Sequence, residues 1–234
     1  MHSVKLSIVA AGALLIGATA YGASYQDDVK RLNESTAVLG EIRVGTDNGI
    51  PDSIWSKAEC VVVIPSMKKA AFIIGGEFGS GVMSCKTGNR WGAPVFMELA
   101  RGSAGFQIGA QSTDLVLVVM NRRGVEKLLS NKVTLGTDAS IAAGPIGRMA
   151  TAATDAQMTA EMLSYSRSRG LFAGIDLSGG TLKPDNSANS RMYGANVSAR
   201  DVALGMRRVS MITEARAFTN ALRNQQAVAT SGKK

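Results

Sequence analysis

The middle of the chain consists of short apolar and β-branched runs separated by turn residues, about 8–12 residues apart. The first run, residues 60–64, reads Cys-Val-Val-Val-Ile and stops at Pro65. Short strands at such intervals are typical of an antiparallel sandwich or barrel. The expected strands cover residues 60–64, 70–75, 81–85, 93–99, 104–110, 113–120, 139–143, 161–167 and 171–177.

Glycine inside these runs restricts the kind of sheet that they can form. Of the 26 glycines in the 234 residues, several fall within expected strands, among them Gly75, Gly81, Gly105 and Gly174. Glycine weakens a strand interior, so it usually marks a bulge, sharp coiling or a close approach of two backbones. We therefore expect a strongly curved, barrel-like or sandwich core of about eight or nine short strands.

Helices are expected to flank this core, which makes the fold class α+β. Residues 25–43 have apolar residues near helical spacing, at Val29, Leu32, Leu39 and Ile42. Further helices are expected over residues 51–57, 125–130 and 185–193, and after Ser198 and Thr213. No long linker is present, so residues 24–224 are expected to form one domain, followed by a flexible tail at 225–234.

The first 23 residues have the pattern of a signal peptide. Lys5 precedes an uncharged apolar run over residues 6–16, and small residues follow as far as Ala23. We expect cleavage after Ala20, or after Gly22 or Ala23, and an exported, periplasmic protein. Peripheral attachment to the inner or the outer membrane is compatible with this pattern. A buried N-terminal helix or an uncleaved anchor is the alternative interpretation.

Two cysteines, Cys60 and Cys85, lie 25 positions apart in expected strands. An exported protein meets a compartment in which disulfides form, and a bridge between two strands suits this spacing. Two buried thiols packed as small apolar side chains are the alternative.

Histidine content excludes large classes of enzyme. The single histidine, His2, lies in the segment expected to be removed. Without histidine the chain has no Ser-His-Asp or Cys-His nucleophile and no usual zinc or non-haem iron site, so we expect no metal and no cofactor.

The glycine loop at residues 76–81 reads G-x-x-G-x-G, the reverse of a dinucleotide fingerprint. A histidine-free hydrolase that uses Glu77 or Glu98 remains as an alternative to a non-enzymatic protein.

The net charge of +8, from 26 bases and 18 acids, indicates an anionic partner or serves solubility alone. Without Lys5 the mature chain keeps 25 bases against 18 acids, or +7. Exported proteins rarely meet nucleic acid, so we expect no nucleic-acid partner and favour an anionic phospholipid surface. The candidate lipid-binding residues are Lys68, Lys69, Arg122, Arg123, Lys127, Arg148, Arg207 and Arg208. The alternative for such clusters is a solvated helix face.

Five segments in order resemble the SYLF domain family. They are AECVVVIPSMKK at residues 58–69, GGEFGSGV at 75–82, GSAGFQIGAQ at 102–111, DLVLVVM at 114–120 and LFAG at 171–174. The resemblance covers roughly residues 30–195 and implies a non-enzymatic lipid-binding domain, often selective for phosphoinositides.

Eukaryotic members of that family carry SH3 or FYVE domains and act in membrane trafficking and actin patches. This chain shows a signal-peptide pattern instead, so the sequence does not favour phosphoinositides or actin as partners. An anionic phospholipid of a bacterial envelope is the expected ligand. Residues 25–43 correspond by position to the membrane-binding N-terminal segment of eukaryotic members. A structural or protein-binding module of the envelope, without a lipid ligand, is the alternative function.

Overall fold

A computed structural model describes residues 7–42, 49–70, 74–104, 113–146, 157, 159–168 and 171–231. Within these ranges, the side chains of residues 7–24, 69–70, 74–75, 103–104, 171 and 228–231 are not described.

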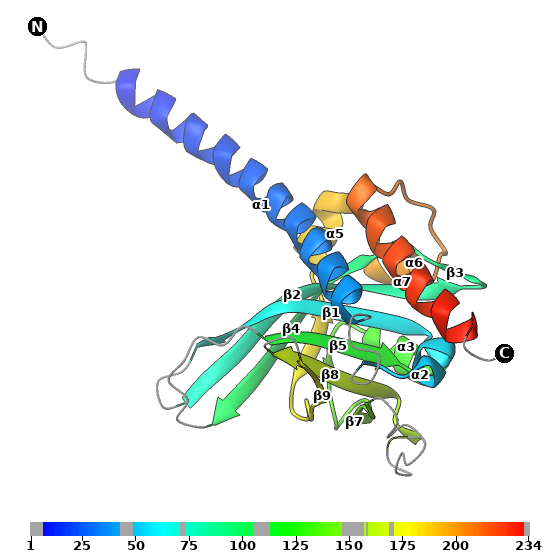
Figure 1. The fold of residues 1–234 in the computed structure, drawn as a ribbon. Coiled ribbons are helices and arrows are strands. Elements are labelled where there is room, and N and C mark those ends of the chain that lie inside the picture. Colours follow the sequence, from blue (N-terminus) through cyan, green and yellow to red (C-terminus); the bar gives the residue numbers. More distant parts are fainter. Residues whose placement is uncertain are drawn as a thin grey trace, which may run out of the picture.

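The described chain forms one curled sheet flanked by helices (Figure 1). The strands are β1 Cys60–Ala70, β2 Ile74–Thr87, β3 Arg90–Trp91, β4 Val95–Ala104, β5 Thr113–Val119, β6 Val133–Thr134, β7 Ile141–Ala143, β8 Met162–Ser168, β9 Leu171–Gly174 and β10 Thr181–Pro184. Their order is β6-β10-β4-β2-β1-β5-β8-β7, with β3 paired to β2 and β9 paired to β8. All pairs are antiparallel except β7 with β8, so the sheet is mixed. The expected α+β fold with a barrel-like core is confirmed.

The helices are α1 Ser7–Ile42, α2 Asp52–Lys57, α3 Arg122–Leu128, α5 Asn186–Tyr193, α6 Ala199–Ala203 and α7 Thr213–Ser231. Helices α1 and α7 lie side by side across one face of the sheet (Figure 1). The first half of α1 projects away from the sheet. Residues 225–231, expected to be a flexible tail, belong to α7, and the amide of Gln225 donates to the Leu39 carbonyl at 2.7 Å.

The two faces of the sheet bury separate apolar clusters. On one face, the strand residues Val63, Val82 and Phe96 pack with Leu39 of α1 and Phe218 of α7. Burial of Leu32, Leu39 and Ile42 confirms the apolar stripe expected for α1. The opposite, inner face of the curled sheet buries the second cluster, which includes Met83, Met97 and Leu117. A sheet covered on both faces explains why its central strands are almost continuously apolar.

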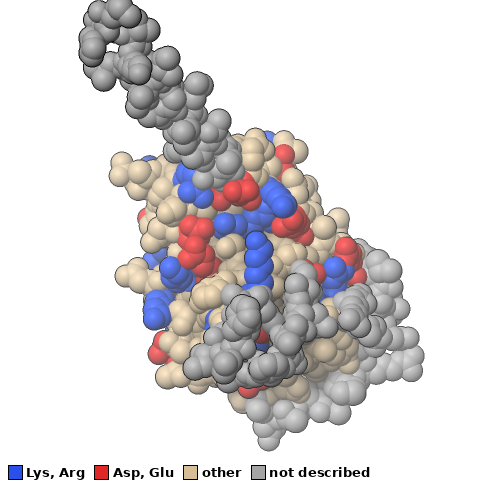
Figure 2. All heavy atoms as spheres, turned by 90° about the vertical axis from the view of Figure 1, so that its left-hand side faces the viewer, with Lys and Arg blue, Asp and Glu red and all other residues tan. Residues whose placement is uncertain are grey.

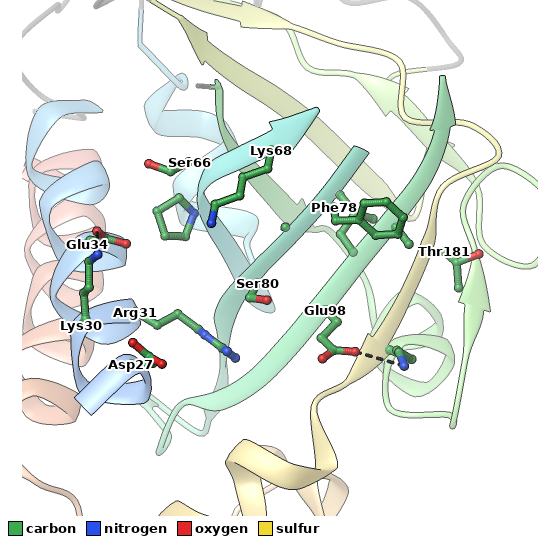
Figure 3. A pocket seen from close by; sticks show the side chains of 15 residues that line it. Asp27, Lys30, Arg31, Glu34, Ser66, Lys68, Phe78, Ser80, Glu98 and Thr181 are labelled. Atoms are coloured by element: carbon green, nitrogen blue, oxygen red, sulfur yellow. Dashed lines mark ion pairs between the residues drawn. The ribbon is translucent and has the colours of Figure 1, made fainter. Parts of the chain in front are cut away.

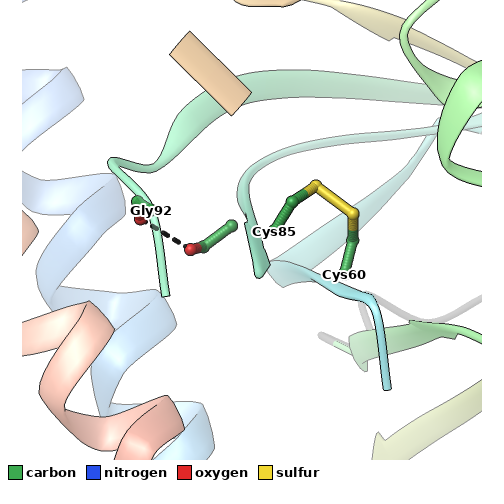
Figure 4. The surroundings of a disulfide bond; sticks show 4 residues. Cys60, Cys85 and Gly92 are labelled. Atoms are coloured by element: carbon green, nitrogen blue, oxygen red, sulfur yellow. Dashed lines mark hydrogen bonds between the residues drawn. A yellow bond between two sulfur atoms is a disulfide. The ribbon is translucent and has the colours of Figure 1, made fainter. Parts of the chain in front are cut away.

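The cysteines confirm the expected disulfide. Cys60 and Cys85 are directly opposite each other on β1 and β2, with Cα atoms 4.0 Å apart, and their sulfur atoms are bonded (Figure 4). In the same region the Ser84 hydroxyl donates to the Gly92 carbonyl at 2.7 Å. The disulfide thus closes the far end of the β1–β2 hairpin.

Strand β1 passes through Pro65, where we expected it to stop. Its pairing register shifts by one residue between Val63 and Lys68 against β2, and between Ile64 and Met67 against β5. One extra residue in β1 therefore forms a β-bulge, a place where a sheet tolerates proline. Next to the bulge, the backbones of β1 and β2 lie very close together. A Cβ on Gly81 would lie 2.0 Å from the Val63 carbonyl oxygen.

Other differences from the expected elements follow from pairing that the sequence does not show. Residues 74–75 and 81–85, expected in two separate strands, belong to one strand, β2. Ala70 is the last residue of β1, and residues 71–73 lie outside the described residues. The short strands β3, β6 and β10 were not predicted. Residues 105–110, expected as part of a strand, lie outside the described residues.

Among the helical residues whose side chains are described, we find no stretch that is long and apolar enough to span a membrane.

Candidate functional site

A groove with a volume of about 700 Å³ lies between α1 and the sheet. One wall is formed by four charged side chains of α1, namely Asp27, Lys30, Arg31 and Glu34 (Figure 3). The floor is the part of the sheet face that lies beyond the helix.

The floor is built from a row of neighbours on four adjacent strands. Lys68 of β1 pairs with Phe78 of β2, Phe78 pairs with Ala100 of β4, and Ala100 pairs with Thr181 of β10. We call these four residues the groove row. All four line the groove, and Figure 3 labels Lys68, Phe78 and Thr181, which belong to β1, β2 and β10. A second row beside it contains Ser80, Glu98 and Lys183.

The bulge in β1 is what brings Lys68 to the groove. Val63 faces the helices and Ile64 faces the inner cluster, so regular alternation would turn Met67 outward and Lys68 inward. The extra residue reverses this alternation. Met67 is therefore buried in the inner cluster, whereas Lys68 is exposed in the groove.

The bulge has an unusual backbone that hydrogen bonds hold in place. Ser66 has φ of 51°, the one positive φ at a non-glycine residue in the described chain. Its amide donates to Asp114 Oδ1 at 2.9 Å, and Asp114 Oδ2 accepts from Arg167 Nε at 2.9 Å. Arg167 also forms an ion pair with Glu41 near the end of α1. Residues in such sparsely populated backbone regions are often found at functional sites.

Phe78 is the most exposed aromatic side chain of the described structure, at 57%. Its ring lies over Gly76, where an added Cβ would come within 2.6 Å of the ring. Glycine at this position therefore lets the ring lie against the sheet. Gly102, the β4 neighbour of Gly76, leaves open space beside it. The groove thus presents one aromatic surface next to a flat stretch of backbone.

Most charges of the groove are neutralised within the protein. Lys183 pairs with Glu98 at 3.0 Å, Arg31 with Asp185 at 2.9 Å and Lys30 with Glu34 at 3.7 Å. Asp27 and Lys68 are the two charged lining residues that form no ion pair with another described residue. The groove therefore offers one cation, beside Phe78, and one carboxylate, on α1, to a binding partner.

A buried ion network fixes α1 beside the groove. Asp28 is fully buried and accepts two hydrogen bonds from Arg191 of α5, at 2.8 and 3.1 Å. Arg31 bonds Asp185, the N-cap of α5, and lies over the Phe96 ring at 5.5 Å. A carboxylate as deeply buried as that of Asp28 persists because it has an opposite charge and good hydrogen bonds. The helical wall of the groove is therefore anchored to the sheet and to α5.

The candidate lipid-binding residues do not gather in one place. Lys68 is in the groove, Arg122, Arg123 and Lys127 are on α3, and Arg207 and Arg208 are exposed in the loop after α6. The side chain of Lys69 and the whole of Arg148 lie outside what the structure describes. On the face shown in Figure 2, basic and acidic side chains alternate. The assignment of these residues to lipid binding stays a prediction.

Acidic partners surround the basic residues of α3. Glu161 accepts from Lys127 Nζ at 2.8 Å and from the Ser140 amide at 2.8 Å, and Arg123 is 3.8 Å away. Arg122 is 4.0 Å from Glu126. Burial raises the pKa of Glu161, but hydrogen bonds from Lys127 and Ser140 and the charges of Lys127 and Arg123 outweigh it, so the pKa is lowered overall. Of these bases, Lys127 is the one that bonds Glu161 closely, whereas the Arg122 and Arg123 side chains remain exposed.

We expect Glu161→Gln to destabilise the protein at pH 7 by about 1.5 kcal/mol, because the charged acceptor of the Lys127 bond is lost. A carboxyl with a lowered pKa stabilises the fold above its unfolded pKa, and this stabilisation disappears as the pH falls through the folded value. The difference between wild type and variant should therefore shrink below about pH 5. Urea unfolding between pH 3 and pH 7 measures it, and a difference that stays constant over this range would contradict the assignment.

The two candidate catalytic carboxylates are held apart. Glu77 is on the inner side of β2, buried beside Met67 and Leu177, and accepts two hydrogen bonds from Arg101 at 2.7 and 3.1 Å. Glu98 lies in the groove, on the other face of the sheet. Two carboxylates on opposite faces cannot act on one bond of a substrate.

Sequence reasoning missed most of the groove. Phe78 stands between glycines in the segment interpreted as a glycine loop, and its exposure follows from strand pairing. The alternation Gly76-Phe78-Ser80-Val82 was the one available signal, because it places an aromatic side chain on the same face as small residues. The groove residues Asp27, Lys30, Arg31 and Lys183 gave no local signal at all.

Comparison with known proteins shows similarity over most of the chain. A family model described as "Ysc84: Las17-binding protein actin regulator" matches residues 100–225. LAS seventeen-binding protein 3 of Saccharomyces cerevisiae is 33% identical over 165 residues, which are 69% of this chain and 36% of that protein. SH3 domain-containing YSC84-like protein 1 of Xenopus laevis is 34% identical over 75% of this chain and 52% of its own length. The chain thus spans between about a third and about a half of these relatives.

These comparisons correct one expectation. The sequence did not favour actin as a partner, but the matching family model is described as an actin regulator and the yeast relative is named as a binder of another protein. The expectation was wrong because it weighed the signal-peptide pattern above the resemblance of the domain itself.

Proposed function

Because the chain belongs to the Ysc84 family, the SYLF domain family, we propose that it is a non-catalytic module that binds a protein partner in the groove between α1 and the sheet. The groove carries this proposal: it is open, it is held in shape by the buried ion network, and it presents an exposed aromatic ring. Aromatic side chains at exposed, well-supported positions are the residues that most often dominate protein–protein binding.

The names of the relatives agree with a protein partner. One is named LAS seventeen-binding protein 3, and others are named SH3 domain-containing proteins. Lipid binding through basic loops has less support, since Arg123 and Lys127 are engaged by Glu161. A catalytic role has less support as well, because Glu77 and Glu98 face opposite sides of the sheet.

We also propose that the protein is exported. The Cys60–Cys85 disulfide supports this, because disulfides persist mainly in oxidising compartments. Cleavage after Ala20, Gly22 or Ala23 would leave Asp27 and Asp28 close to the start of a shortened α1, where carboxylates stabilise a helix. Cell fractionation with thiol labelling tests the proposal; a cytoplasmic protein with free thiols would contradict it.

A pair of matched variants tests the proposed function. Phe78 and Met206 are both exposed apolar residues, but only Phe78 lies in the groove. Immobilised wild type and Met206→Asp should capture the same protein from cell extract, in stoichiometric amount, and Phe78→Asp should lose it. In parallel, each protein is sedimented with phosphatidylglycerol and with phosphatidylcholine vesicles. Equal capture by Phe78→Asp, or binding to anionic vesicles alone, would contradict the proposal.

A further inference from the structure

The groove row also contains information about the chemistry of the partner. Neighbouring strands are about 4.8 Å apart, so the row from Lys68 to Thr181 spans about 14 Å. An extended peptide advances about 3.3 Å per residue, so five residues cover about 13 Å. Their first, third and fifth side chains point the same way, and these three could face the row together.

The row presents a different surface at each step. Lys68 is a cation with no ion-pair partner among the described residues, and Phe78 beside it is an exposed ring. Ala100 and Thr181 follow, with a small methyl group and a hydroxyl. In a bound peptide, a carboxylate would complement Lys68 and an apolar side chain would pack on Phe78. The third peptide side chain, opposite Ala100 and Thr181, would have to be small or polar.

We propose that the groove binds an extended segment of a partner protein in which an acidic residue lies two positions from an aromatic or large aliphatic residue. This inference rests on the proposed function and defines the partner of the same site. The acidic residue pairs with Lys68, the apolar residue packs on the Phe78 ring, and the chain runs across the strands beside α1.

The polar lining favours a peptide over a lipid chain. The hydroxyls of Ser80 and Thr181 are half-buried and make no hydrogen bond within the described part of the chain. A peptide backbone has amide and carbonyl groups that can bond to them. An acyl chain would cover these hydroxyls and the Glu98–Lys183 pair without replacing their hydrogen bonds to water, which is unfavourable.

The test uses a library of random twelve-residue linear peptides displayed on phage and selected on the full-length protein. We expect enriched peptides to carry Asp or Glu two positions from an aromatic or large aliphatic residue. Selection on Lys68→Glu should replace the acid by Lys or Arg at the same position. Selection on Lys57→Glu, the same change at an exposed lysine of α2 outside the groove, should return the wild-type pattern.

Affinity measurements on a synthetic enriched peptide complete the test. Fluorescence polarisation should show at least about tenfold weaker binding to Phe78→Ala and to Lys68→Glu, and unchanged binding to Lys57→Glu. Peptides that need Phe78 but show no acid would overturn the proposed chemistry and leave the proposed function standing. The absence of any peptide whose binding depends on the groove would also overturn the proposed chemistry. The proposed function would still stand, because protein capture by wild type, Met206→Asp and Phe78→Asp tests it separately.

Two other occupants of the groove are distinguishable outcomes. Binding to phosphatidylglycerol vesicles that is lost in both Phe78→Ala and Lys68→Glu, with no enriched peptide, would assign the groove to a lipid. A dimer in analytical ultracentrifugation that dissociates on Phe78→Ala would assign it to a second copy of the chain. Either result would overturn the inference.

Discussion

Replacing Asp28 with alanine is expected to lower the free energy of unfolding by about 4 kcal/mol, the largest effect that we predict. The Asp28 carboxylate is fully buried and receives both hydrogen bonds of the Arg191 fork. Its removal leaves Arg191, and in part Arg31, as partly buried cations that have lost an opposite charge. Urea unfolding at pH 7 measures the change.

The adjacent residue provides the control. Asp27 is exposed at the groove and forms no ion pair with a described residue, so Asp27→Ala should change stability by less than about 0.5 kcal/mol. The double variant Asp28→Ala/Arg191→Ala should be less destabilised than the sum of the single variants, because it removes both members of the pair. Equal effects of Asp27→Ala and Asp28→Ala would show that the network does not anchor α1.

Loss of the disulfide is the second large effect. The bond closes a loop of 25 residues, and the chain-entropy relation gives about 3.5 kcal/mol for a loop of this size. Reduction of the wild type should lower the urea midpoint by an amount that corresponds to this loss. The variant Cys60→Ala/Cys85→Ala should show the same lowered midpoint. Reductant should not affect the variant. An unchanged midpoint on reduction of the wild type would contradict this estimate.

This stabilisation bears on the groove because of where the bond is. Cys60 and Cys85 are at the far end of the hairpin that carries Lys68 and Phe78. If the disulfide keeps β1 and β2 in register, peptide binding should weaken under reducing conditions even where the protein remains folded.

The sequence predicted the fold class and the disulfide, because both depend on local patterns. β-Branched runs between turn residues indicate strands wherever they pair, and two such runs placed Cys60 and Cys85 within reach. The bulge could not be predicted. Proline within an apolar run indicates the end of a strand, and only the neighbouring strands show that β1 continues past Pro65 with one extra residue.

Ion pairing of the basic residues could not be predicted from the sequence either. Lys127 looks unpaired in the sequence because its acid, Glu161, lies 34 residues away. Lys68, by contrast, remained unpaired among the described residues and turned toward the groove. Sequence reasoning selects basic residues by composition, but tertiary pairing decides which of them can meet a partner.

The most direct test of the account is photo-cross-linking in living cells from position 78. Replacement of Phe78 by p-benzoylphenylalanine keeps an aromatic ring in the groove, and the same replacement at Met206 serves as the control. We predict one abundant protein adduct from position 78, identified by mass spectrometry, that is absent from position 206. Adducts to lipid alone, or the same adducts from both positions, would contradict a protein-binding groove.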